Sequence, residues 1–191
     1  MELQHVNVKL LVKNPEEVDL APLIPIFHNW IHGKVFEELL LDVADYQHVP
    51  SGPGVVLIGL QANYSVDNAG NRLGVRYNRK AALEGANQDR LAQAARAAVT
   101  ACQRLEAEAA LEGKFGFNGQ DVDVFVNDRL LAPNGEGTRK ALEPELRAFF
   151  KKLFRGGEYS LSYGSDPRSL FGVSARAAKP LSLSNLLENL A

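Results

Sequence analysis

The chain has 191 residues, of which 46% are hydrophobic and 23% are charged, and its formal net charge is −2. This composition is ordinary for a water-soluble globular protein, and the length suits one hydrophobic core better than two. The nearly balanced charge gives no general attraction to polyanions, so neither nucleic acid nor a membrane surface is expected as a partner.

The single cysteine, Cys102, rules out an intrachain disulfide and fits a reducing compartment. Residues 1–15 lack the basic and apolar regions of a signal peptide, and no apolar run approaches the roughly 20 residues of a membrane span. The sequence therefore predicts a cytoplasmic protein.

Seven strands are predicted from apolar residues that alternate with polar ones or form short runs bounded by turns. They cover residues 6–12, 39–46, 56–66, 73–77, 122–126, 159–163 and 173–177. The run Leu39–Leu41 is typical of a buried strand, which would leave the following Asp42 partly shielded from water.

Helical spacing of apolar residues predicts helices over residues 26–32, 87–112 and 144–155. Asn87 is the expected cap of the second helix, and Pro144 fits the first turn of the third. Residues 180–191 carry four leucines at helical spacing, which predicts a tail helix that buries them.

A turn at Asn68–Asn71 predicts a β-hairpin. A two-residue loop at Ala69–Gly70 would pair Val66 with Leu73 and Tyr64 with Val75, which places apolar residues on one face.

These elements predict an α+β fold in which one mostly antiparallel sheet of about seven strands carries three main helices and a short C-terminal helix. Because no linker interrupts the pattern, residues 1–178 are expected to form a single domain and residues 179–191 an amphipathic tail helix.

No phosphate-binding loop, dinucleotide fingerprint, CxxC, HExxH or GxSxG motif is present. The densest group of reactive side chains is Asp42, Asp45, Tyr46 and His48, at the end of the second strand. Together they could act as an acid–base pair. The alternative is structural, with the aspartates bonded to loop amides and Tyr46 closing a core edge.

His28 and His32 share one helix face, which is workable geometry for metal ligands. A divalent metal, the only cofactor suggested, would be held by His28, Asp45 and His48. Arg72 and Arg76 lie on the polar face of the predicted hairpin and could bind a small anionic ligand, although a solvated sheet face is the commoner explanation for such residues.

Three classes of function follow. The first is a ligand- or partner-binding domain, expected to self-associate as a homo-oligomer, because no complete catalytic set is visible. The second is a small acid–base or metal-assisted enzyme that uses the Asp42, Asp45, Tyr46 and His48 loop. The third is a structural assembly subunit. Whether the protein catalyses a reaction is left open by the sequence.

Overall fold

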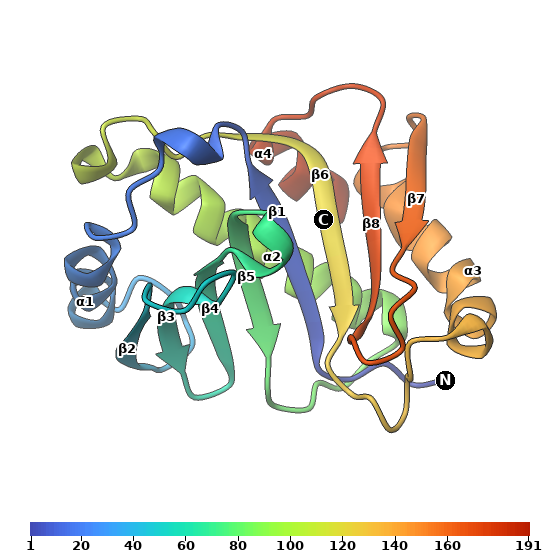
Figure 1. Ribbon diagram of the computed structural model, residues 1–191. Helices are drawn as coiled ribbons and strands as arrows, with labels where there is room; N and C mark the ends of the chain where they lie inside the picture. Colours follow the sequence, from blue (N-terminus) through green and yellow to red (C-terminus); the bar gives the residue numbers. More distant parts are fainter.

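A computed structural model describes residues 1–191 and contains one eight-stranded antiparallel sheet with helices beside it (Figure 1). The order of strands is β2-β3-β4-β5-β1-β6-β8-β7. The strands are β1 (Val6–Val12), β2 (Leu40–Tyr46), β3 (Gly54–Gly59), β4 (Ala62–Asp67), β5 (Gly74–Arg79), β6 (Phe117–Val126), β7 (Tyr159–Tyr163) and β8 (Phe171–Ala177). The predicted α+β class is confirmed.

The eighth strand arises because the predicted strand 56–66 is a hairpin of β3 and β4. The chain reverses at Leu60 and Gln61, neither of which is a typical turn residue. Gly59 permits the close approach, because a Cβ there would lie 2.6 Å from the carbonyl oxygen of Ala62. The reversal also changes the buried face of β3, where Val55 and Leu57 point to the core.

The predicted register of the β4–β5 hairpin is wrong by two residues. Val66 pairs with Val75, and Tyr64 pairs with Tyr77. The connection is longer than two residues because a 3₁₀ turn, η2 (Ala69–Asn71), lies between the strands. A shift of two keeps every side chain on its predicted face, so the apolar and polar faces of the hairpin are as expected.

Four α-helices complete the structure: α1 (Leu23–Gly33), α2 (Asn87–Ala107), α3 (Glu136–Leu153) and α4 (Leu183–Leu190). In Figure 1, α2 and α4 lie behind the sheet, with α1 near one end and α3 near the other. Helix α2 packs on β1 and β5, and α4 packs on α2, α3 and β6. None of the helices combines the length and hydropathy needed to cross a membrane.

Several helix ends differ from the prediction. Helix α2 ends at Ala107, and its N-cap is Ala86 rather than Asn87, whose Oδ1 instead accepts from the Leu3 amide at 2.8 Å. Helix α3 begins at Glu136, and Pro144 lies inside it. Proline is tolerated there because Pro144 is exposed, so water can reach the carbonyl group left without its helical donor.

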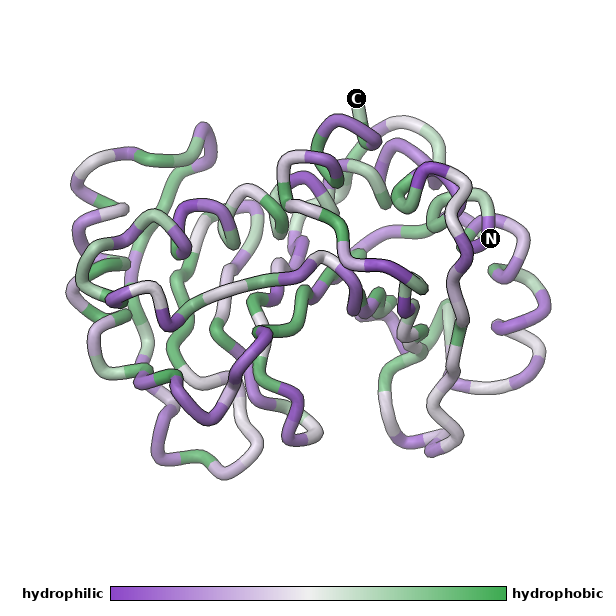
Figure 2. The backbone as a smooth tube through the Cα atoms, turned by 90° about the horizontal axis from the view of Figure 1, so that it is seen from above, coloured by the Kyte–Doolittle hydropathy of each residue, from purple (hydrophilic) through white to green (hydrophobic).

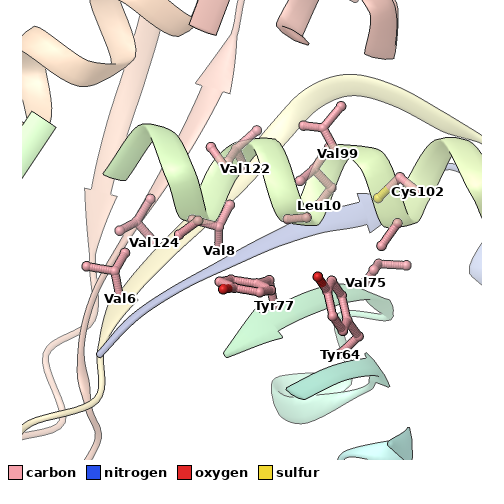
Figure 3. Close-up of a cluster of buried hydrophobic side chains, with 14 of the residues drawn as sticks. Val6, Val8, Leu10, Tyr64, Val75, Tyr77, Val99, Cys102, Val122 and Val124 are labelled. Carbon is pink, nitrogen blue, oxygen red and sulfur yellow. The ribbon is translucent and has the colours of Figure 1, made fainter. Parts of the chain in front are cut away.

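The core lies between the sheet and the helices, where Figure 3 shows Val8, Leu10 and Val122 facing Val99 and Cys102 of α2. Alanines of α2 let the helix lie close to the strands. In Figure 2 hydrophobic and hydrophilic residues alternate in short stretches, as expected for elements that bury one face. The predicted tail helix is confirmed as α4, and it buries Leu183, Leu186 and Leu190.

Candidate functional site: a pocket beside helix α2

The predicted catalytic group lies on an edge strand, because β2 pairs only with β3. Asp42, Asp45, Tyr46 and His48 are all exposed, so the predicted shielding of Asp42 is wrong. The aspartates accept from nearby backbone amides, of Val43 at 2.8 Å and of Gln47 at 2.9 Å. The Tyr46 and His48 rings are 6.4 Å apart. An acid–base role for this loop stays a prediction.

The predicted metal ligands are not brought together. His28 and His32 are exposed residues of α1. No three His, Cys, Asp or Glu side chains of the chain gather in a way that could hold a metal ion, so His28, Asp45 and His48 do not form a ligand set.

Arg72 and Arg76 lie on the sheet face opposite the helices and contact buried carboxylates. Arg72 Nη1 donates to Asp123 Oδ2 at 2.8 Å and to Ser174 Oγ at 3.0 Å. The Arg76 guanidinium lies over the Phe125 ring, 4.8 Å from its centre. Both arginines already have acidic or aromatic neighbours, and the anion-binding role predicted for them stays a prediction.

Ion pairs with buried residues join these two partly exposed arginines to the centre of the sheet. Lys9 is 2% exposed, and its Nζ donates to Asp67 Oδ1 at 2.5 Å. Arg76 Nη1 lies 3.7 Å from the other oxygen of Asp67. Burial lowers the pKa of Lys9, and the neighbouring Asp67 opposes that effect. Burial also raises the pKa of Asp123, against the opposing effect of Arg72. We call Lys9, Asp67, Arg72, Arg76 and Asp123 the ion network.

A pocket of about 540 Å³ opens on the other face of the sheet, beside α2. We call it the Tyr64 pocket. Four separate parts of the chain line it: the segment before β2, the β3–β4 turn, strands β4 and β5, and one side of α2. The lining residues are Phe36, Glu37, Glu38, Leu39, Leu60, Gln61, Tyr64, Tyr77, Arg79, Gln93, Arg96, Ala97 and Thr100.

A short hydrogen bond fixes the carboxyl group of Glu38 in this pocket. The Tyr64 hydroxyl donates to Glu38 Oε1 at 2.5 Å. Burial raises the pKa of Tyr64 far above its usual value, and the bond to Glu38 raises it further. Tyr64 is therefore protonated at neutral pH and remains a donor. The second oxygen, Glu38 Oε2, is buried and has no donor.

A second polar pair lies on the α2 side of the pocket. Gln93 Nε2 donates to the Tyr77 hydroxyl oxygen at 3.0 Å, while Gln93 Oε1 is buried without a donor. Burial is also the main cause of the raised pKa of Tyr77. Arg79 directs its guanidinium to the carbonyls of Ala81 and Ala82, at 2.8 and 3.3 Å. The site thus holds two buried acceptor oxygens that no neighbouring group satisfies.

Aromatic rings form one wall of the pocket. The Phe36 and Tyr64 rings stack with centres 4.6 Å apart, and Tyr64 meets Tyr77 edge-on at 5.1 Å. Figure 3 shows both tyrosines beside the core residues that face α2. Trp30, the only tryptophan, packs edge-on against Phe36 at 5.6 Å. Trp30 is therefore close enough to the pocket wall for its fluorescence to report changes there.

Sequence reasoning placed Tyr64 and Tyr77 on the correct apolar face but overlooked Glu38 and the polar side of α2. A signal was present, because Gln93, Arg96 and Thr100 recur at helical spacing and so share one helix side. Nothing local indicated that this side would meet Glu38, because their contact depends on the order of strands.

Comparisons with protein-family models, with curated proteins and with solved structures find no match to this chain, so the geometry of the Tyr64 pocket is the main guide to function.

Proposed function

We propose that the protein is a small-molecule-binding domain whose ligand occupies the Tyr64 pocket. The observation that carries the proposal is the pair of buried acceptors, Glu38 Oε2 and Gln93 Oε1, beside a pocket of about 540 Å³ with an aromatic wall. Ligand sites are typically concave, largely apolar, and provided with a few convergent polar groups. Groups with shifted pKa values also concentrate at functional sites, and Tyr64 is such a group.

Filling the pocket should abolish ligand binding. Ala97 lines the pocket from α2, so Ala97→Trp would occupy part of its volume. We expect the wild-type protein to gain about 5–10 °C in melting temperature from a ligand present at about 100 times its Kd, by mass action. The filled variant should remain folded, by far-UV circular dichroism, and show no gain. The measurement is a thermal-shift screen of amines, amino acids, carboxylic acids, sugars and nucleosides.

The matched control is Ala107→Trp, which adds the same ring to the exposed end of α2. It should respond to ligands as the wild type does. Ligands that stabilise Ala97→Trp as strongly as the wild type would show that binding occurs elsewhere on the molecule.

We also propose that the chain self-associates through the edge formed by β2. Five of the eight large hydrophobic residues that are exposed lie on or near this edge, which singles it out from the remaining surface. They are Leu39, Leu41, Tyr46, Val49 and Leu60. An edge strand also has backbone groups free to pair with another chain.

Leu41→Glu should therefore reduce the solution mass. The wild type is expected at twice the chain mass of 20.9 kDa by light scattering, and the variant at one chain mass. Leu130→Glu provides the control, because Leu130 is 96% exposed and lies far from β2 in the sequence. A wild-type protein that stays monomeric at about 100 µM, well above the Kd of a specific dimer, contradicts the proposal.

A further inference from the structure

The unpaired polar atoms at the Tyr64 pocket are hydrogen-bond acceptors, so a ligand that pairs with them needs hydrogen-bond donors. Buried polar atoms in folded proteins nearly always have hydrogen-bond partners. Glu38 Oε2 has none, although Tyr64 holds the other oxygen of the same carboxyl group at 2.5 Å. A carboxylate has no proton of its own to offer, so any group that satisfies this oxygen must be a donor.

The two arginines of the pocket and the Gln93 amide nitrogen donate to other acceptors. Arg79 donates to two backbone carbonyls and, at 3.4 Å, to Gln61 Oε1. Arg96 Nη1 donates to the carbonyl of Leu190 at 2.7 Å. The amide nitrogen of Gln93 donates to Tyr77, which leaves the Gln93 oxygen open as a second acceptor. The arginines and the Gln93 amide nitrogen therefore leave both oxygens open to donors from a ligand or from water.

A protonated primary amine fits this arrangement best among common donor groups. It carries three N–H bonds, enough for both acceptors, and its positive charge strengthens the hydrogen bond to a carboxylate. The aromatic wall of Phe36, Tyr64 and Tyr77 adds apolar contact surface for the rest of the ligand, whereas the Arg104 guanidinium already lies over the Phe36 ring, 5.3 Å from its centre. Glu37, also at the pocket, adds a second negative charge.

We propose that the ligand of the Tyr64 pocket is a small organic molecule with a protonated primary amine, bound through Glu38 and Gln93 against the aromatic wall. This assignment rests on the proposed function. The apolar part of the ligand would lie against Phe36 and Ala97 inside the pocket. The pocket also contains Arg79 and Arg96, so two acidic and two basic residues line it. A zwitterionic amine with a carboxylate is therefore compatible with the site, whereas an anion without an amine is not.

Four probes of similar size and shape test the assignment by calorimetric titration at neutral pH. They are 2-phenylethylamine, 2-phenylethanol, 3-phenylpropanoate and the N-trimethylated form of the amine. We expect the amine to bind about 10- to 100-fold more tightly than the alcohol, because only the amine makes charge-assisted hydrogen bonds. The trimethylated cation keeps the charge but loses every N–H, so it should bind at least about tenfold more weakly than the amine. Trp30 fluorescence gives an independent readout at the pocket.

Glu38→Gln provides the variant test. It keeps an oxygen for Tyr64 and removes the negative charge beside the pocket. Amine affinity should fall at least about tenfold, while affinity for the alcohol should change little. Glu84→Gln is the control, because Glu84 is exposed and does not line the pocket. It should retain most of the amine affinity.

The outcomes separate this assignment from the proposed function. If the alcohol or the acid binds as tightly as the amine, and Ala97→Trp abolishes that binding, the pocket is a ligand site but the amine assignment is wrong. Equal binding of the amine and its trimethylated form also overturns the assignment. The assignment also fails if the amine does not bind at a concentration of about 10 mM, because even an affinity too weak for function would be detected at that concentration. The broader thermal-shift screen then decides whether the pocket binds another class of ligand.

Discussion

Asp67→Asn is expected to lower the free energy of unfolding by about 3–5 kcal/mol, because it removes the charge that compensates the buried Lys9 and the partly buried Arg76. Asp67 is 4% exposed and lies next to Lys9 and Arg76 in the ion network. Its Oδ1 also accepts from the Ala69 amide at 3.0 Å, which fixes the start of the β4–β5 connection. Urea unfolding followed by circular dichroism measures the change.

Two further variants isolate the cause. Asp166→Asn removes an exposed partner of Arg168 and should cost less than about 1 kcal/mol. The double variant Lys9→Met and Asp67→Asn removes both charges of the close pair, so it should be more stable than Asp67→Asn alone. A double variant that is less stable than the single one would mean that Lys9 contributes through its packing rather than through its charge.

Leu186→Ala should be the most destabilising single truncation in the tail, with an expected loss of about 2–5 kcal/mol in the free energy of unfolding. Leu186 is fully buried where α4 packs against α2 and α3. Leu187→Ala is the matched control, because Leu187 is only partly buried and its truncation should cost less. Thermal and urea unfolding of both variants test the difference.

Deleting residues 180–191 extends this test. It removes all of α4 and exposes the apolar surfaces of α2 and α3 that the helix covers. We expect a lower melting temperature or an increase in solution mass through association of the uncovered surface. If neither property changes, the tail contributes little to the fold.

Strands with one solvent-exposed and one buried face could be predicted from the sequence, because apolar and polar residues alternate along them. In β1, Val6, Val8 and Leu10 point to the helices as expected. The tail helix could be predicted for the same reason, since its leucines recur at helical spacing. These patterns reflect local geometry and need no knowledge of neighbouring elements.

The order of strands could not be predicted, and the errors at the site follow from it. Leu39 and Leu41 suggested a buried strand, yet they are 59% and 50% exposed because β2 is at the edge of the sheet. The reversal at Leu60 was missed because leucine and glutamine do not favour turns, and only the close backbone contact at Gly59 explains it.

The Tyr64 pocket could not be predicted from the sequence for a related reason. Its polar groups come from residues 38, 64 and 93, which are distant in the sequence and meet only after the sheet has formed and α2 has packed on it. Local chemistry favoured the Asp42–His48 loop because reactive residues are concentrated there along the chain. Concentration along the chain does not imply convergence in space.

The reactivity of the buried Cys102 thiol can be used to measure how often the core opens. The thiol is completely buried between α2 and the sheet, and burial raises its pKa well above the usual value (Figure 3). Because thiol reagents attack the thiolate, native Cys102 should be inert both sterically and chemically. Its alkylation rate then measures how often α2 separates from the strands, with no engineered label and no competing thiol. Such rates, followed with and without a pocket ligand, would show how far binding beside α2 slows the exposure of the core.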